Sequence, residues 1–463
     1  MMRPWVYTKP PDGDWGWMIV LSLFLESALV FGLIRSFGVF FVEFTKYFEQ
    51  PASSVSWITS IGVALQQFAS PIASALCNKY GARPVVMIGG VLASSGMIVA
   101  SLAATNLLHL YLSIGLLSGL GWALVFTPTV ASVTRYFVKR RTLATGIGFT
   151  GIGVSSFAFS PLFQLLVEMY GWRGALLILG GLSLNLVVCG ALLRPLVLLD
   201  DQVRSSTQSH SQKLYCHSWM SWQRLSELLD LSLLCHKSFL TYVAAITFIN
   251  TGYFVPYVHL VAHGRLTGLS EYEAAFVMSA TAVTDLFGRV ASGWFSDLHK
   301  FRLVHILAFL NGLTGISLLL IPLGTSFISL LALGLIYGFF SGALTPVVFS
   351  LLPEIVGLGR IFSALGLFQM IESIGGLLGA PLSGWLRDIT GSFTASFMVA
   401  GGLHLAGSFM LSFLPQFCSF GNPNSQRPEL RELSNGSRPL NDSSQLDFPT
   451  QEHSTVEVEQ SST

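Results

Sequence analysis

The sequence has few charged residues. Asp, Glu, Lys and Arg make up 11% of its 463 positions, whereas soluble globular proteins carry about 25%. Hydrophobic residues account for 52%, and the mean hydropathy is +0.62. This composition argues against an ordinary soluble domain and indicates that most of the chain lies in a lipid bilayer. We expect no nucleic-acid partner.

Cysteine is scarce, and no cluster of metal ligands is visible. The cysteines are scattered, with neither a CxxC pair nor the spacing of a metal site: Cys77, Cys189, Cys216, Cys235 and Cys418. Neither a disulfide framework nor a zinc site is therefore predicted. His259 and His263 are four residues apart but lack a third ligand, which favours a packing or water-contacting role. Since no nucleophile–base pair appears either, we expect no enzymatic activity and no cofactor.

Long hydrophobic runs dominate the rest of the chain. A membrane-spanning helix needs about 20 apolar residues, and twelve runs are long enough. They centre on Met18–Val42, Val55–Cys77, Val85–Ala104, Leu107–Tyr136, Leu143–Met169, Ala175–Leu193, Ser238–Ala262, Ala274–Phe295, Leu303–Leu323, Ile328–Leu352, Ile361–Leu386 and Phe393–Leu414. The predicted class is an all-α membrane protein with twelve transmembrane helices.

One large polar break divides these runs into two sets of six. The expected parts are an N-terminal segment (1–17), a six-helix bundle (18–195), a linker (196–237), a second six-helix bundle (238–414) and a disordered tail (415–463). The first 17 residues lack the apolar core of a cleavable signal. Lys and Arg gather in alternate loops and in the linker, which predicts that both termini and the linker are cytoplasmic.

A weak internal repeat indicates pseudo-symmetry. Ser70-Pro71, Ser160-Pro161 and Ala380-Pro381 each precede a glycine that lies ten residues after the proline. Asp388 lies seven residues after its proline, and Asp297 occupies the matching place in the eighth run. The spacing of three helices implies inverted three-helix units, the plan of major facilitator transporters.

The eighth run, Ala274–Phe295, carries Asp285 and Arg289 in its middle. A charge at mid-bilayer costs at least about 2.5–3.5 kcal/mol, and such residues usually face a bundle interior or a water-filled cavity. Two positions four apart share one helix face. One interpretation is a buried ion pair that locks two helices together. The interpretation we favour is a solute site, because burying an ion pair is a poor route to stability.

Arg35 lies deep in the first run, so each half contributes one well-buried cation. We expect Arg35 and Arg289 to face a shared cavity. A guanidinium presents a fork of donors that matches a carboxylate. Two cations and one acid suit a singly charged organic anion.

Other membrane-embedded features have competing interpretations. Glu26 and Glu372 are intramembrane acids for which a functional role and a packing role remain open. Gly146–Gly151 matches GxGxxG, but no strand precedes it, so a nucleotide site is not expected. Small residues at this spacing instead let transmembrane helices approach closely.

Two motifs resemble the signatures of the monocarboxylate transporter family. Pro-Asp-Gly-Asp-Trp-Gly-Trp occupies positions 11–17, where the family usually has Asp-Gly-Gly-Trp-Gly-Trp. Tyr-Phe-Val-Lys-Arg-Arg-Thr-Leu-Ala-Thr-Gly at 136–146 resembles the second signature. Trp172–Ala175 and Gly384–Asp388 add to the match. The resemblance covers about residues 10–415, apart from most of the linker.

The resemblance implies a twelve-helix major facilitator fold and transport of lactate, pyruvate or ketone bodies, often with a proton. The family's helix-8 Asp and Arg match Asp285 and Arg289, and its helix-1 Lys falls at Arg35. Arginine cannot give up its proton in a protein, whereas a buried lysine can. Asp285 therefore becomes the candidate proton carrier. The resemblance also implies a single-span glycoprotein chaperone as a partner.

We therefore predict a plasma-membrane secondary transporter, with the Golgi or another internal membrane as the alternative location. Substrate binding is assigned to Arg35, Arg289 and Asp285. The candidate cavity-lining residues are Phe37, Phe40, Phe254, Tyr257 and Glu372, and the candidate gating or structural residues are Lys139, Arg140, Arg141, Asp297 and Asp388. Alternatives are a facilitator of another solute, such as an amino acid or aromatic acid, without proton coupling, and a non-transporting receptor or scaffold.

Overall fold

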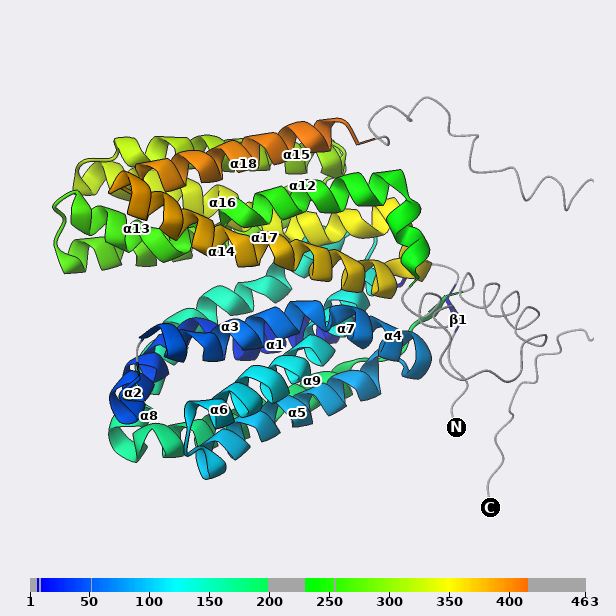
Figure 1. The fold of residues 1–463 in the computed structure, drawn as a ribbon. Helices are drawn as coiled ribbons and strands as arrows, with labels where there is room; N and C mark the ends of the chain where they lie inside the picture. The colour runs from blue at the N-terminus through cyan, green and yellow to red at the C-terminus, as the bar shows by residue number, and fades with distance from the viewer. Residues whose placement is uncertain (1–5, 8–9, 51, 199–229, 254, 415–463) are drawn as a thin grey trace, which may run out of the picture. The chain divides into compact units, whose positions relative to one another are not determined.

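A computed structural model describes residues 6–7, 10–50, 52–198, 230–253 and 255–414. These residues belong to one compact unit, Met1–Phe417, in which the helices form two halves (Figure 1). The first half contains α1 (Gly16–Ser36), α2 (Gly38–Phe48), α3 (Ala52–Phe68), α4 (Ser70–Tyr80), α5 (Ala82–Ala103), α6 (Leu107–Leu110), the π-helix η1 (Tyr111–Ser118), α7 (Gly119–Tyr136), α8 (Arg141–Ser183) and α9 (Asn185–Leu192).

The second half follows the linker. It contains the 3-10 helix η2 (Leu231–Cys235), α12 (Lys237–Tyr253), α13 (Val255–Leu266), α14 (Glu271–Ser296), α15 (Leu303–Leu320), the 3-10 helix η3 (Ile321–Leu323), α16 (Phe327–Val356), the 3-10 helix η4 (Leu358–Arg360), α17 (Ile361–Thr390) and α18 (Thr394–Ser412). The predicted disordered tail and most of the predicted linker lie outside the described residues.

Several predicted runs are broken helices. The first run is divided at Phe37 into α1 and α2, and the second is bent by 44° between α3 and α4, where Pro71 begins the next turn. The fifth and sixth runs share α8, which breaks at Gly171 with φ 67° and ψ 170°. A positive φ suits glycine because it has no Cβ. The chain thus turns between two predicted spans at this residue.

Within the described residues, ten helices are long and apolar enough to cross a membrane, or eleven when the bent pair α3–α4 counts as one span. The all-helical class is confirmed, while the count of twelve and the cytoplasmic termini stay predictions. Two short strands, β1 (Val6–Tyr7) and β2 (Val197–Leu198), pair in parallel. This pairing brings the N-terminal segment beside the start of the linker, consistent with both lying on one side of the membrane.

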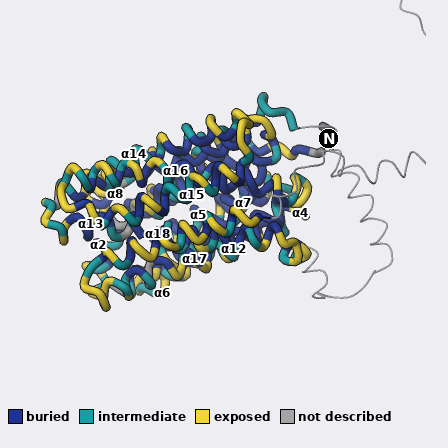
Figure 2. Tube along the Cα trace, turned by 90° about the horizontal axis from the view of Figure 1, so that it is seen from above, coloured by how far each residue is buried: buried dark blue, intermediate teal, exposed yellow. Residues whose placement is uncertain are grey.

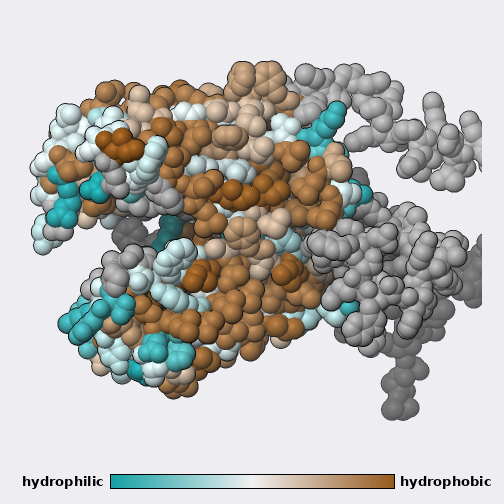
Figure 3. Space-filling model, in the orientation of Figure 1, coloured by the Kyte–Doolittle hydropathy of each residue, from teal (hydrophilic) through white to brown (hydrophobic). Residues whose placement is uncertain are grey.

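On the side of the molecule that Figure 3 shows, apolar side chains cover much of both halves. Large apolar residues that are exposed include Phe287, Trp294, Phe309 and Phe409. In water such a surface would be unstable, whereas hydrocarbon accommodates it. Buried positions gather along the inward sides of helices such as α7 and α16 (Figure 2), so the polar residues buried there are shielded from lipid.

The two halves meet along two helix seams. In the first, a Cβ at Gly146 of α8 would lie 2.6 Å from the Arg289 carbonyl oxygen of α14. In the second, Gly366 of α17 packs against the Ser70–Pro71 bend at the start of α4. The surface is hollowed between the halves at the end where α2 and α13 lie (Figures 1 and 3). The halves are therefore joined toward the β1 end and separated at the opposite end.

Candidate functional site

Helix α14 carries the charged pair and has a well-defined start. Ser270 caps it, because the Ser270 hydroxyl accepts from the Glu273 N–H at 3.3 Å while the Glu273 carboxylate accepts from the Ser270 N–H at 2.9 Å. Such a capping box satisfies helix donors that would otherwise be unpaired. The register of α14, and with it the facing of Asp285, is fixed from this end.

Three glycines of α16 bring it into backbone contact with α14. Gly334, Gly338 and Gly342 are spaced by four, so they lie on one face of α16. A Cβ at Gly338 would overlap the Thr281 backbone, and a Cβ at Gly342 would overlap the Asp285 backbone. The acid is thus held at the tightest part of the helix pair. This glycine spacing was readable in the sequence but was not singled out there.

Asp285 and Arg289 form a buried ion pair. Arg289 Nε donates to Asp285 Oδ2 at 2.9 Å, and Arg289 Nη2 donates to Asp285 Oδ1 at 3.3 Å. Each residue is 1% exposed. A third donor is the Tyr257 hydroxyl of α13, 3.2 Å from Asp285 Oδ1. The carboxylate is therefore held by three donors, which compensates the cost of burying its charge.

The guanidinium of Arg289 is only partly satisfied. Within the part of the chain that the structure describes, its Nη1 has no hydrogen-bond partner. A buried donor left unpaired costs about 1–3 kcal/mol, and more when it is charged. The geometry therefore retains an unused cationic donor beside the ion pair, suited to an oxygen of an anionic group.

Arg35 comes from the first half and reaches the same region. Its guanidinium carbon lies 5.4 Å from the centroid of the Tyr257 ring, a cation–π contact. The prediction that Arg35 is well buried is wrong, because its side chain is exposed. Arg35 lies in the last turn of α1, just before the chain breaks at Phe37. The two cations therefore differ in exposure to solvent: the Arg35 side chain is exposed, whereas that of Arg289 is buried.

Tyrosines surround the pair. The Tyr257 ring lies 5.6 Å from that of Tyr253 and 6.0 Å from that of Tyr337. The Tyr337 hydroxyl donates to the Tyr253 carbonyl oxygen at 3.0 Å, and Ser341 lies 3.4 Å from the Tyr257 hydroxyl. Tyr257 was predicted as an apolar wall, but it also supplies a polar contact. The sequence analysis did not identify Tyr253, Tyr337 and Ser341. They lie on different helices, and the sequence of each helix does not show which residues of other helices it contacts.

Phe37 and Phe40 pack inside the first half. Phe37 is 7% exposed and Phe40 0%; the Phe37 ring meets those of Phe40 and Phe44, and the Phe40 ring also meets that of Phe163 on α8. That they line the cavity stays a prediction. Phe254 lies outside the described residues.

The remaining acids are dispersed. Glu372 is half-buried on α17, where its backbone carbonyl accepts from Asn250 Nδ2 at 3.1 Å. Glu26 is fully buried on α1, and neither of its carboxyl oxygens has a hydrogen-bond partner among the residues described. Asp388 falls within α17, but its side chain is not among those described. None of these three has a described contact with the ion pair.

Asp297 joins the two halves at the end of α14. Its carboxylate accepts from the backbone N–H groups of Thr142, at 3.1 Å, and Leu143, at 2.8 Å, in the first turn of α8. A negative charge at a helix N-terminus is favourable. Burial raises the pKa of Asp297, and the two backbone donors oppose that shift. At the related place in the first half, Asn78 Nδ2 donates to Ser363 Oγ at 2.9 Å. The Asp297 contact between the halves therefore involves a charged group, whereas the Asn78–Ser363 contact is neutral.

The two signature motifs contact each other. Asp12 Oδ1 accepts from the N–H groups of Val138, at 2.6 Å, and Lys139, at 2.7 Å. The Trp17 and Phe137 rings also meet, with centroids 5.3 Å apart. The N-terminal segment thus holds the loop that precedes α8.

The basic residues of the second signature lie in this loop. Lys139 and Arg140 are exposed, whereas Arg141 is buried and its Nε donates to the Phe137 carbonyl oxygen at 2.9 Å. Burial lowers the pKa of Arg141, which nearby Glu354, Asp12 and Asp297 oppose. Arg141 therefore tightens the turn between α7 and α8.

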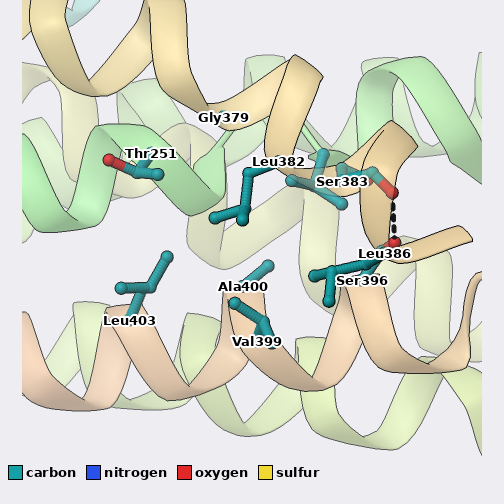
Figure 4. Close-up of a pocket in the computed structure, with 10 residues that line it drawn as sticks. Thr251, Gly379, Leu382, Ser383, Leu386, Ser396, Val399, Ala400 and Leu403 are labelled. Carbon is teal, nitrogen blue, oxygen red and sulfur yellow. Dashed lines mark hydrogen bonds between the residues drawn. The ribbon is translucent and has the colours of Figure 1, made fainter. Parts of the chain in front are cut away.

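Two of the pockets formed by the described residues lie away from the charged pair. One lies among α12, α17 and α18, where a hydrogen bond of 2.8 Å joins Ser396 to the Ser383 carbonyl oxygen (Figure 4). The other is an apolar groove between α8 and α14, lined by Gly153, Val154, Ala282, Val283, Leu286 and Phe287. Neither contains a charged residue, so neither replaces the Asp285–Arg289 region as the candidate site.

The histidines do not form a metal site. No group of three potential ligands occurs in the described part of the chain. The His259 ring stacks on Phe393 at 4.8 Å, and the His263 ring meets Phe397 edge-on at 5.2 Å. Both histidine rings therefore pack against aromatic side chains at the start of α18.

Comparisons with known proteins agree with this architecture. The Major Facilitator Superfamily model matches residues 23–327 and 240–442. Monocarboxylate transporter 13 of Rattus norvegicus is 57% identical over 422 residues, covering 91% of this chain and 94% of the relative. Monocarboxylate transporter 11 of Homo sapiens is 44% identical, covering 88% of this chain and 84% of the relative.

Solved structures support the fold. The E. coli fucose:proton symporter matches with a TM-score of 0.67 and 16% identity, covering 86% of this chain and 98% of that one. A human organic anion transporter, MFSD10, matches with a TM-score of 0.61 and 17% identity, covering 87% and 100%. The family model and the relatives show that the chain belongs to the monocarboxylate transporter family of the Major Facilitator Superfamily and is a multi-pass membrane transporter, not an enzyme.

Proposed function

We propose that this transporter moves small organic monocarboxylates across the membrane by alternating access, with Arg289, Asp285 and Arg35 as the binding residues. The observation that carries this proposal is the buried guanidinium of Arg289, whose Nη1 has no partner among the described residues. A carboxylate oxygen is the natural acceptor for such a donor. The names of the relatives, monocarboxylate transporters 13 and 11, support the same substrate class.

The charges of the three residues suit one anionic group. Asp285 neutralises Arg289 in the ion pair at 2.9 Å, so the exposed Arg35 supplies the net attraction for an incoming anion. At the buried position, the anion competes with Asp285 for Arg289. Breaking a buried pair without replacement costs about 3–5 kcal/mol. A substrate carboxylate provides that replacement.

Asp285 is the proposed proton carrier if transport is linked to protons. When the substrate takes over Arg289, Asp285 loses the cation that stabilises its charge, and protonation then relieves an uncompensated buried anion. Arg35 cannot take this role because a guanidinium keeps its proton.

A second candidate is a facilitator of aromatic acids or amino acids without proton coupling. The tyrosine cluster favours it, since the Tyr257 ring contacts the Arg35 guanidinium and the rings of Tyr253 and Tyr337 lie 5.6 and 6.0 Å from that of Tyr257. Aromatic rings attract each other at centroid distances of about 4.5–7 Å. The permanent charge of Arg35 is compatible with uncoupled transport of such an anion.

Uptake into proteoliposomes separates these candidates. Radiolabelled L-lactate, pyruvate, benzoate and tryptophan would be supplied with and without an inward proton gradient. We expect saturable lactate or pyruvate uptake that falls at least tenfold in Arg289→Ala, whereas Arg83→Lys, an exposed control, retains it. Uptake unchanged in Arg289→Ala would refute the assignment. Uptake confined to the aromatic compounds and independent of the gradient would favour the second candidate.

A further inference from the structure

Tyr257 contacts both charged parts of the site. One face of its ring lies against the Arg35 guanidinium of the first half, with 5.4 Å between the guanidinium carbon and the ring centroid. Its hydroxyl donates to Asp285 Oδ1 of the second half at 3.2 Å. A single half-buried side chain therefore connects an exposed cation with a pair whose members are each 1% exposed.

We propose that Tyr257 is a positioning residue through which anion binding at Arg35 loosens the Asp285–Arg289 pair. This inference rests on the proposed function and adds an order of events to it. The carboxylate meets the exposed Arg35 first, and Tyr257 then releases Asp285, which admits the carboxylate to Arg289.

The physical basis is electrostatic. A cation is held over an aromatic face by its charge, so a carboxylate that neutralises Arg35 weakens the hold of Arg35 on the ring. A freed ring can turn, and its hydroxyl then leaves Asp285. The Asp285 carboxylate then keeps only the two Arg289 donors, at 2.9 and 3.3 Å. Its buried charge is less well compensated, and a proton that neutralises it frees Arg289 for the anion.

The surroundings give Tyr257 alternative contacts once it turns. Ser341 of α16 lies 3.4 Å from its hydroxyl. The other titratable or charged groups near Asp285 are Arg289 on α14, Tyr253 on α12, Tyr337 on α16 and Arg35 on α1. Tyr111 of the first half is a matched control, because its hydroxyl donates to the Ser54 carbonyl oxygen at 2.6 Å and no role in the site is assigned to it.

The test is a double-variant cycle in the full-length protein. The uptake KM and maximal rate for radiolabelled L-lactate and pyruvate would be measured for wild type, Arg35→Gln, Tyr257→Leu and the double variant. Tyr257→Phe, which keeps the ring, and the control Tyr111→Phe are measured in parallel. Because the anion and the ring oppose each other at Arg35, we expect Tyr257→Leu to lower KM by about three- to tenfold, the range of a cation–π contact. In the Arg35→Gln background the same substitution should change KM by less than twofold.

Tyr257→Phe separates the ring from the hydroxyl. It should keep KM within about twofold of wild type while changing the maximal rate, since the ring stays and the hydroxyl contacts with Asp285 and Ser341 are lost. Tyr111→Phe should change neither KM nor the maximal rate. An equal KM effect of Tyr257→Leu in both backgrounds would overturn the proposal.

If wild type carries neither probe, the proposed function fails and the coupling is measured without substrate. The thermal midpoints of the purified Arg35→Gln, Tyr257→Leu and double variants would then be compared. Non-additive shifts support the Arg35–Tyr257 link, and additive shifts overturn it.

Discussion

At the scale of single residues, Asp285 and Arg289 act as a pair. Asp285→Asn alone leaves a buried, uncompensated guanidinium, so we expect it to destabilise the folded protein by about 3–5 kcal/mol. The charge-neutral double variant Asp285→Asn/Arg289→Gln should recover most of that stability and still fail to transport. Thermal unfolding in detergent and uptake in proteoliposomes measure the two effects separately. A double variant that is less stable than either single variant would contradict a compensating pair.

A second residue-scale prediction concerns Asp297 and pH. Burial raises the pKa of Asp297 above the ordinary value of 3.8, so the folded protein binds this proton more tightly than the unfolded chain does. The contribution of Asp297 to stability is therefore present at low pH and is lost as the pH rises through the folded pKa.

The expected result is a thermal midpoint with a component that falls as the pH rises above 3.8 and that disappears in Asp297→Asn. Glu168→Gln, which alters an exposed carboxylate bonded to Gln164, is the control and should retain the component. An identical pH profile for Asp297→Asn and wild type would argue against this shift.

Residue identity was more predictable than residue environment. Asp285 and Arg289 were identified because charges inside an apolar helix are conspicuous, and their spacing of four predicted their contact. Arg35 was also identified, but its exposure was not, because the break of the first run at Phe37 leaves no polar signal in the sequence. Tyr257 was expected to be apolar lining, since its hydroxyl contact depends on how α13 and α14 meet.

At the scale of helices, the glycines of α16 determine where α14 lies. A Cβ at Gly342 would overlap the Asp285 backbone, so Gly342→Ala must displace one helix by a few tenths of an ångström or more. We expect a destabilisation of about 1–3 kcal/mol and at least tenfold slower uptake. Gly402→Ala on α18 is the control, since nothing lies within 4 Å of its added Cβ. Equal behaviour of the two variants would contradict this role of Gly342.

Helix breaks were less predictable than helix positions. The apolar runs located the spans because lipid demands long stretches without charge. Gly171 and the α3–α4 bend depend on local backbone geometry, which hydropathy does not report. The α8–α14 approach at Gly146 agrees with the interpretation of its GxGxxG sequence as helix packing rather than as a nucleotide site.

At the scale of the whole molecule, alternating access requires the joined ends of the two halves to separate. Asn78 of α4 and Ser363 of α17 bridge the second seam, with Nδ2 and Oγ 2.9 Å apart. Cysteines at both positions, linked by a short bifunctional thiol reagent, should reduce uptake at least tenfold, and a reductant that cleaves the linker should restore it. The single variants Asn78→Cys and Ser363→Cys, treated in the same way, control for native cysteines. Full activity of the linked protein would exclude opening at this seam.

The exposed Arg35 of the first half affects how transport should respond to membrane voltage. Two arginines and one aspartate give the proposed site a single positive charge when it is empty, and a bound monocarboxylate would cancel it. A charge that crosses the full field gains or loses about 2.3 kcal/mol per 100 mV. In a cell with a negative interior, the unloaded carrier should therefore rest facing inward, and turnover without protons should respond to membrane voltage through its return step alone.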